Sequence, residues 1–348
     1  MGTYIVIFFL LLVLELLYFK VADRYNIIDK PNERSSHSMI VLRGGGIIIS
    51  ISMIAWAVMM FVQGQVITDY LPFLCGIIMI SGVSFWDDVK SLPDSLRLIV
   101  HFVAMVLMLY PIINDCGLFL PDNWYWGVLF LCVSLIVCVG GANFINFMDG
   151  INGITAGYSL AVLIPLLILN RGLDFIEESL LVVAILGVLV FCIFNFRPKG
   201  KAKCFAGDVG SIGTAFIMLF AISKLIFQTG DVTYLLLLLV YGVDGGLTIV
   251  HRVMLHENLG QAHRKHAYQI MANELKIGHI KVSLLYMVMQ FVVSLGLIYL
   301  CPNTMSAHLL YGICLILLFA CAYIVFMKKY YYLHEEYLHS LKDERTTD

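Results

Sequence analysis

The sequence predicts an all-α protein that crosses a membrane about eleven times as one polytopic helical bundle. Hydrophobic residues make up 60% of the 348-residue chain and charged residues only 13%, and the mean hydropathy is +0.89. Both compositions lie far from those of soluble domains. The apolar runs are about 17 to 22 residues long, which suits helices across a hydrocarbon core of about 30 Å and is too long for barrel strands. We expect a single integral membrane domain over residues 1–348.

The expected spans have short connections on one side of the membrane and longer, polar connections on the other. In chain order they cover about residues 3–22, 44–62, 67–86, 96–113, 124–142, 154–170, 178–195, 211–228, 233–250, 280–300 and 307–327. The first span begins with Met-Gly-Thr-Tyr and has neither a basic start nor a small-residue cleavage site. We therefore expect a retained helix instead of a signal peptide.

The distribution of Lys and Arg predicts the orientation of the bundle. With the N-terminus outside, 20 of the 22 basic residues fall on the inner side, and only Arg171 and Lys224 lie near the outer side. Basic residues near span ends accumulate on the cytoplasmic side of a membrane. We expect an external N-terminus and a cytoplasmic C-terminus, in the cytoplasmic (inner) membrane of a bacterium.

Four carboxylates lie at the inner ends of the expected spans: Asp87 and Asp88 in "WDDVK", Asp149 in "NFINFMDGINGI" and Asp208 in "FAGDVGSIG". Carboxylates that gather with few neighbouring bases repel one another, so such a group usually contains a hard cation such as Mg²⁺, which prefers oxygen ligands. The alternative is that each aspartate is a solvated cap at a helix terminus.

Glycines surround two of these aspartates. In "AGDVGSIG" they come just before a span, where backbone N–H groups at a helix N-terminus can approach a phosphate closely. The run "MDGINGI" has the same character, although Asp-Gly is also a common turn. These two runs lie on the same face as a third acidic site, the pair Asp87 and Asp88. Together they predict a centre that binds phosphate and metal.

Basic and histidine side chains on the same face are candidate phosphate ligands. They occur in "KPNERSSHSMIVLRGGG", "RPKGKAK" and "HRKHAYQ". His37, His263 and His266 offer N–H donors to phosphate oxygens, and Arg264 adds a charged donor. Zinc ligation by His263 and His266 is disfavoured, because no thiolate or further histidine lies nearby in the sequence.

Other charged residues favour structural interpretations. The lysine pairs Lys201 with Lys203 and Lys328 with Lys329 are best explained as topogenic, with attraction to anionic lipids as the physical basis. Asp244 lies inside a span among glycines, and we expect it to pair with a basic neighbour as structural support near the site.

These runs, in this order, resemble the polyprenyl-phosphate N-acetylhexosamine-1-phosphate transferase family, also called glycosyltransferase family 4. That family includes bacterial undecaprenyl-phosphate GlcNAc-1-phosphate transferases and phospho-N-acetylmuramoyl-pentapeptide translocases. The resemblance extends over about residues 20–280 through "DKPNERSSHS", "GGG", "DDVKSLP", "NFINFMDGINGI", "FAGDVGSIG" and the last His-containing loop.

The resemblance implies an enzyme that moves a sugar-1-phosphate from a UDP-sugar to undecaprenyl phosphate and releases UMP. It implies Mg²⁺, with Mn²⁺ as an alternative, and a role in starting cell-surface polysaccharide assembly of the O-antigen type. The implied partners are the UDP-sugar, undecaprenyl phosphate and membrane lipids, with no nucleic acid. The resemblance also allows a homodimer.

Residues are assigned from the matching motifs. The expected catalytic residues are Asp87, Asp88 and Asp149, the expected metal ligands are Asp208 and Asp87, and the expected substrate-binding residues are Asn146, His37, His263, Arg264 and His266. One of the paired aspartates is expected to deprotonate or orient the lipid phosphate, and His266 is expected near the diphosphate.

The last loop departs from the pattern of family members that use GlcNAc, which tend to have His-x-His-His. Here Tyr268 and Gln269 replace the paired histidines, as in a bacterial O-antigen subgroup that resembles this chain and is thought to use 6-deoxy-N-acetylhexosamines. Asn152 is a second departure, where the translocases usually have Asp, and is therefore a poorer catalytic candidate.

Three alternatives remain from the sequence. A transporter would place polar residues and broken helices at the membrane midplane, whereas here they lie at one face. A different Mg²⁺-dependent membrane phosphotransferase of the CDP-alcohol type would need an Asp-Gly followed by Ala-Arg and two further spaced aspartates, which "DGINGITAGYSLAV" lacks. A noncatalytic binder of lipid phosphate would bind without turnover.

Overall fold

The computed structural model describes residues 2–29, 40–122, 124–258 and 263–347, with side chains described up to residue 340. The elements in chain order are α1 (Gly2–Arg24), β1 (Ile28–Asp29), β2 (Val41–Leu42), α2 (Ile47–Val62), the 3₁₀ turn η1 (Thr68–Tyr70), α3 (Leu71–Val89), α4 (Asp94–Asp115), α5 (Trp124–Phe147), α6 (Ile154–Leu173), α7 (Glu178–Asn195), α8 (Gly207–Thr229), η2 (Val232–Leu238), α9 (Leu239–Met254), α10 (Ala267–Asn273), α11 (His279–Tyr299) and α12 (Met305–Thr347).

The chain is an all-α polytopic membrane protein. Ten helices or helical segments are long and apolar enough to cross a membrane, and they coincide with ten of the eleven expected spans. The remaining span coincides with α2, which has 16 residues and would be about 24 Å long at 1.5 Å per residue. One boundary differs clearly, because α12 continues to Thr347 where the expected span ended near residue 327.

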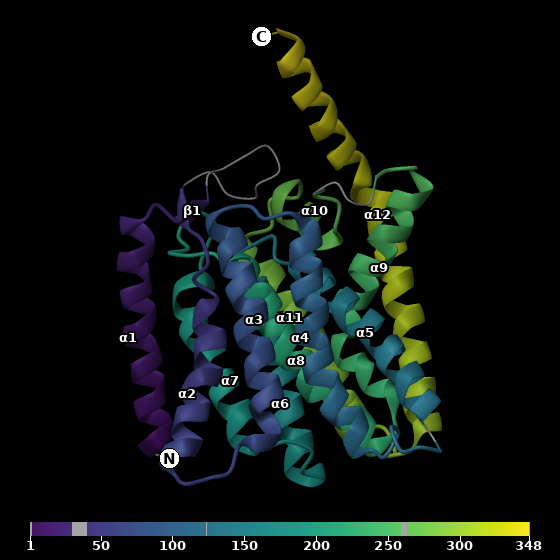
Figure 1. The fold of residues 1–348 in the computed structure, drawn as a ribbon. Helices are drawn as coiled ribbons and strands as arrows, with labels where there is room; N and C mark the ends of the chain where they lie inside the picture. Colours follow the sequence, from purple (N-terminus) through teal and green to yellow (C-terminus); the bar gives the residue numbers. More distant parts are fainter. Residues whose placement is uncertain (1, 30–39, 123, 259–262, 348) are drawn as a thin grey trace.

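The longer connections gather at one end of the bundle (Figure 1). This end, called the loop end below, holds α10, the C-terminus and the short antiparallel pair β1–β2, in which Ile28 faces Leu42. The N-terminus lies at the opposite end. The expectation that the polar connections converge on one side of the membrane is therefore met in the described residues.

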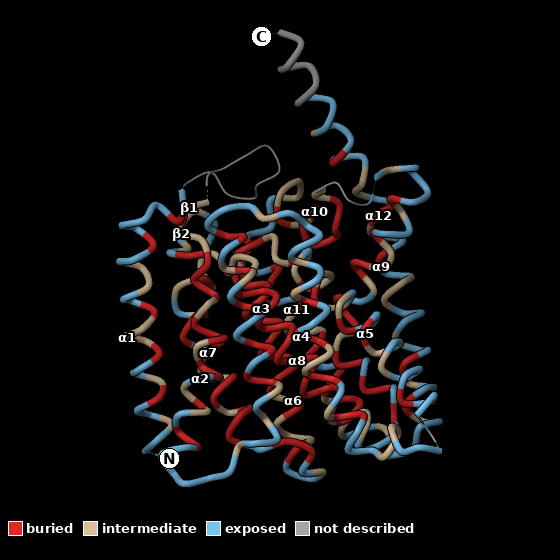
Figure 2. Tube along the Cα trace, in the orientation of Figure 1, coloured by how far each residue is buried: buried red, intermediate tan, exposed pale blue. Residues whose placement is uncertain are grey.

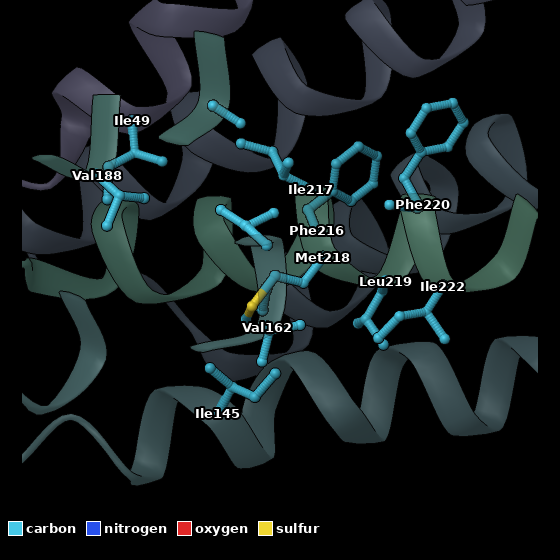
Figure 3. Close-up of a cluster of buried hydrophobic side chains, with 14 of the residues drawn as sticks. Ile49, Ile145, Val162, Val188, Phe216, Ile217, Met218, Leu219, Phe220 and Ile222 are labelled. Carbon is cyan, nitrogen blue, oxygen red and sulfur yellow. The ribbon is translucent and has the colours of Figure 1, made fainter. Parts of the chain in front are cut away.

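The helix α8 forms the centre of the bundle. Its residues from Val209 to Ser223 are all buried. Figure 2 shows that burial is concentrated in the middle of the bundle, whereas α1 at its side alternates between buried, intermediate and exposed residues. Figure 3 shows aliphatic and aromatic side chains of α8 together with side chains from neighbouring helices, among them Ile49, Ile145, Val162 and Val188. Phe73 of α3 stacks on Phe216 and Phe220 of α8, with ring centroids 5.7 and 4.2 Å apart. Such stacked pairs fix the register between α3 and α8.

Candidate active site

Asp88 joins the last turn of α3 to the first turn of α8. Its Oδ1 accepts a hydrogen bond from the backbone N–H of Asp208 (2.9 Å), and its Oδ2 accepts one from the N–H of Val209 (3.0 Å). A carboxylate at this position satisfies free N–H groups of the helix and complements the helix dipole. Asp88 thus caps α8 from another helix and brings Asp208 next to the acidic pair.

Two arginines bridge the three carboxylates. Arg97 of α4 places Nη1 2.7 Å from Oδ2 of Asp87 and 3.1 Å from Oδ2 of Asp208. Arg43 places Nε 2.7 Å from Oδ1 of Asp88 and Nη2 3.9 Å from Oδ1 of Asp208. Burial opposes the charge of Arg43, but the neighbouring Asp88 and Asp208 outweigh it and raise the pKa of the guanidinium. The expectation of few compensating bases is therefore wrong.

The three carboxylates differ in how much of each remains available. The side chain of Asp88 is 0% exposed, that of Asp87 is 9% exposed and that of Asp208 is 18% exposed. Asp88 is engaged by Arg43 and by the N-terminus of α8, and Asp87 also accepts the N–H of Leu92 at 2.7 Å. Asp208 is the most accessible of the three, whereas Asp88 is engaged in holding the site together.

Asn146 and Asp149 lie where α5 ends. Asn146 Oδ1 accepts a 2.5 Å hydrogen bond from Ser211 of α8, and its side chain also hydrogen-bonds Asp208. Asp149 follows in the connection to α6, where its Oδ1 accepts a 2.5 Å hydrogen bond from Thr155. Burial raises the pKa of Asp149 to about 6, against the lowering effect of the Thr155 hydrogen bond.

The glycines of "GGG" and "AGDVGSIG" have mainly a packing role in the described residues. A Cβ on Gly46 would collide with Cα of Gly210 and lie 2.8 Å from the carbonyl oxygen of Ala206. Gly207 has a φ of +68°, and a Cβ there would lie 2.9 Å from Cα of Gly44. These contacts let the start of α2 approach the start of α8. The N–H groups of α8 expected to approach a phosphate instead donate, in part, to Asp88.

The His263–Gln269 segment forms a second cluster at the loop end. The rings of His263 and His266 lie 4.9 Å apart, and Nδ1 of His266 lies 3.6 Å from Oδ1 of Asp244. Burial, together with His266 and Arg252, lowers the pKa of His263 to about 3, so this imidazole is neutral at physiological pH.

Asp244 of α9 anchors this segment, as expected of a structural support. Its carboxylate accepts hydrogen bonds from the N–H of Ala267 (3.0 Å), the hydroxyl of Tyr286 (2.5 Å) and the hydroxyl of Thr248 (3.3 Å). These partners tie α9, α10 and α11 together.

Replacement of Asp244 with asparagine should therefore destabilise the loop end. Asparagine removes the negative charge and replaces one acceptor oxygen with a donor, so that at least one partner is left without a hydrogen bond in a buried site. We expect a loss of about 2 kcal/mol of unfolding free energy, measured by thermal unfolding in detergent. Asp69→Asn, an exposed aspartate in η1, is the matched control, and equal stability of the two variants would contradict this role.

Arg264 points away from the acidic cluster. Its Nη2 lies 2.8 Å from Oε1 of Glu274, and its guanidinium lies 4.2 Å from the ring centroid of Tyr337 in α12. The same Glu274 oxygen lies 3.1 Å from Nδ1 of His334. Arg264 therefore braces the segment against α12 in this structure.

The connection between α5 and α6 lies between the two clusters. The hydroxyl of Tyr268 is 3.5 Å from the carbonyl oxygen of Phe147, and a Cβ on Gly150 would lie 2.8 Å from Nε2 of Gln269. Asp149 is thus flanked by Asp208 on one side and by the start of α10 on the other. Asn152 is used structurally, since its Nδ2 donates to the carbonyl of Arg197 at 3.0 Å.

The structure brings together Asp87, Asp88, Asp208 and Asn146 in one cluster, with Asp149 beside them, and places His263 and His266 in the neighbouring cluster. His37 lies outside the described residues. Sequence reasoning included Arg43 in a candidate basic run without giving it a role, and it missed Arg97. The available signal was the short connection between α3 and α4, which must place the first turn of α4 beside the last turn of α3.

Within residues 2–29, 40–122, 124–258 and 263–347, no group of three or more His, Cys, Asp or Glu side chains is arranged to hold a metal ion. The candidate donor set is therefore small. It consists of the oxygens of Asp87 and Asp208 that both face Nη1 of Arg97.

Comparison with known proteins finds one family model and several relatives that match this chain. A model described as glycosyl transferase family 4 matches residues 70–227, a stretch that contains the acidic cluster but not the His263–Gln269 segment. A relative from Bacillus subtilis, named a probable undecaprenyl-phosphate N-acetylglucosaminyl 1-phosphate transferase, is 25% identical over 72% of this chain and 70% of its own length.

Two further relatives are named phospho-N-acetylmuramoyl-pentapeptide-transferase. The one from Thermotoga maritima is 29% identical over 44% of this chain and 52% of its own length. The one from Streptococcus equi subsp. zooepidemicus is 32% identical over 43% of each chain, so the matches to these two relatives span only about half of their length. The family model, which contains the acidic cluster, and these relatives confirm the resemblance to glycosyl transferase family 4 over residues 70–227.

Proposed function

We propose that the protein transfers a sugar-1-phosphate from a UDP-sugar to undecaprenyl phosphate and releases UMP. The observation that carries the proposal is the convergence of Asp87 and Asp208 on one guanidinium nitrogen of Arg97. Two carboxylates facing one positive charge, with a second arginine beside them, form an arrangement suited to a cation and to phosphate groups. The names of the relatives support this class of reaction.

The residues present fit Mg²⁺. This ion is usually held in phosphate-transfer sites by one or two carboxylates, with substrate phosphates and water as further ligands, so no larger protein cage is required. Asp208 and Asp87 would hold it, because their converging oxygens are of the preferred type and Asp208 is accessible. When bound, Mg²⁺ would neutralise charge on the diphosphate of the nucleotide.

The transfer itself is one displacement at phosphorus. An oxygen of the lipid phosphate forms a bond to the β-phosphorus of the UDP-sugar, the bond from that phosphorus to the bridging oxygen breaks, and UMP leaves with this oxygen. A lipid phosphate is already ionised at neutral pH, so little basic catalysis is needed and positioning dominates. Arg43 and Arg97 carry the positive charge to orient phosphate oxygens. Asp88 holds Arg43 directly, whereas Arg97 is held by Asp87 and Asp208.

The setting at the loop end supports the same reaction. Undecaprenyl phosphate presents its head group at the membrane surface, and a UDP-sugar arrives from water, so both can reach only the ends of the helices. We place this end in the cytoplasm of a bacterium, with Mn²⁺ as an alternative ion and O-antigen-like polysaccharide assembly as the role. The donor sugar is an N-acetylhexosamine or a 6-deoxy-N-acetylhexosamine, as the resemblance of the loop that contains Tyr268 and Gln269 implies.

The proposal is tested with the purified full-length protein in detergent. Undecaprenyl phosphate and a panel of UDP-N-acetylhexosamines are supplied with Mg²⁺, UMP release is followed, and the lipid product is identified by mass. We expect UMP and a lipid-linked sugar diphosphate in equal amounts with at least one donor. Binding of both substrates without UMP release would contradict the proposal in favour of a noncatalytic binder.

A further inference from the structure

A cavity opens at the loop end between α1, the β1–β2 pair and the segment that joins α7 to α8. Its volume is about 790 Å³, and Phe19, Ile28 and Val41 are among its apolar lining residues. Its basic lining residues are Lys20, Arg197, Lys201 and Lys203. The cavity thus combines apolar walls with a positively charged border.

The positive charge of this border is not neutralised by the described part of the chain. Lys20, Lys201 and Lys203 have no carboxylate oxygen within 4 Å there, and Asp23 is the acidic residue among the described residues that line the cavity. Arg43 and Arg97, by contrast, are both held in ion pairs. Several basic groups that no described carboxylate neutralises, beside apolar walls, are suited to an anionic group attached to a hydrophobic body.

Hydrogen bonds fix the backbone conformation of residues 197–203, the basic segment between α7 and α8. The side-chain amide of Asn152 donates to the carbonyls of Arg197 (3.0 Å) and Pro198 (3.1 Å). The N–H of Lys201 donates to the carbonyl of Pro198, and the N–H of Lys203 donates to a carbonyl of α7, both at 2.9 Å. The lysines therefore project from a fixed turn, which distinguishes this border from a flexible basic tail.

The cavity adjoins both the acidic cluster and the membrane. Leu42 lines it while Arg43, the next residue, contacts Asp88, so β2 separates the cavity from the carboxylates. On the membrane side, Leu17 and Val21 of α1 are 50% and 47% exposed, and Lys20 lies between them in the sequence. Acyl chains packed along this face of α1 would bring a lipid phosphate to the lysines.

We propose that this cavity binds the phosphate head group of an anionic phospholipid, with its acyl chains against α1. The lipid is a component of the surrounding bilayer and is distinct from the polyprenyl phosphate that reacts at Asp208. Charge complementarity selects an anionic head group over a zwitterionic one. Because the lipid contacts α1, β2 and the segment between α7 and α8, its binding also stabilises the side of the bundle next to Arg43.

The test compares Lys201→Gln/Lys203→Gln with Lys328→Gln/Lys329→Gln in the full-length protein. The second pair is also basic and exposed, but it lies on α12 and does not line the cavity. Native mass spectrometry measures binding of phosphatidylglycerol and phosphatidylcholine. Loss of each lysine should weaken the affinity for phosphatidylglycerol about five-fold, so we expect Lys201→Gln/Lys203→Gln to bind this lipid about 25-fold more weakly. The control variant should keep its affinity at the cavity.

A second measurement separates this lipid from the acceptor substrate. Phosphatidylglycerol should raise the thermal unfolding temperature of the wild-type protein and the control, but not of Lys201→Gln/Lys203→Gln. Equal loss of binding in both double variants would show diffuse attraction and overturn the proposal. It would also be overturned if the cavity variant kept its phosphatidylglycerol binding and instead raised the KM for undecaprenyl phosphate.

Discussion

Asp208→Asn should lower Mg²⁺-dependent UMP release by on the order of 100-fold or more, because electrostatic contacts to transferring phosphoryl groups account for effects of this size. Asp208 is the most accessible carboxylate of the cluster, and it shares Nη1 of Arg97 with Asp87. Asparagine keeps the shape of the side chain but removes the charge that a cation requires. UMP release is measured over a series of Mg²⁺ concentrations.

The variant is expected to remain folded, since the N-terminus of α8 is held by Asp88 through backbone N–H groups that Asp208→Asn leaves in place. Asp87→Asn should lower the rate by a similar factor, because it removes the other converging oxygen. Asp69→Asn serves as the control, because Asp69 lies in η1 before the first turn of α3 whereas Asp87 lies in the last turn of α3. Near-normal Mg²⁺-dependent UMP release by purified Asp208→Asn would show that the metal assignment is wrong.

Gly46→Ala should both destabilise the bundle and inactivate the protein. The added Cβ meets the backbone of Gly210 and Ala206, and backbone atoms at a helix contact cannot move aside as a flexible side chain can. We expect a loss of about 3 kcal/mol of unfolding free energy. The start of α2 must also shift, which displaces Arg43 from Asp88 and should lower UMP release by on the order of 100-fold.

Thermal unfolding and UMP release are measured together for this variant. Gly82→Ala in α3 is the matched control, because a Cβ on Gly82 has no heavy atom within 4 Å. Gly210→Ala should reproduce the effect from the other side, since its Cβ would lie 2.6 Å from Cα of Gly46. If Gly46→Ala matched Gly82→Ala in both measurements, the close approach of α2 to α8 would not be needed.

The helical bundle was predictable because each span depends on a local run of apolar residues. Length alone identifies such a run, so even α2, with 16 residues, was located correctly. The extension of α12 was missed for the same reason: its inner part is rich in Tyr, Lys, Glu and His, and it is stabilised by contacts such as that of Tyr337 with Arg264, which a hydropathy pattern does not register.

The residues of the acidic cluster were predictable from the sequence, but the hydrogen bonds and ion pairs among them were not. The four aspartates could be assigned to one face because spans of known order alternate direction. That Asp88 caps α8 could not be predicted, since this contact joins residues 120 positions apart in the chain. The role of Arg43 depends on the glycine contacts between the start of α2 and the start of α8, and that of Arg97 depends on the packing of α4 beside the last turn of α3.

The bridged cluster also has a consequence for the order of substrate binding. Three carboxylates and two guanidinium groups leave one negative charge in excess among Asp87, Asp88, Asp208, Arg43 and Arg97. A bare nucleotide diphosphate is repelled by such a site, whereas a divalent cation is attracted to it. For the proposed reaction, the nucleotide sugar should therefore enter together with the ion, as its magnesium complex, or after it, and binding of the bare nucleotide sugar before the ion is disfavoured.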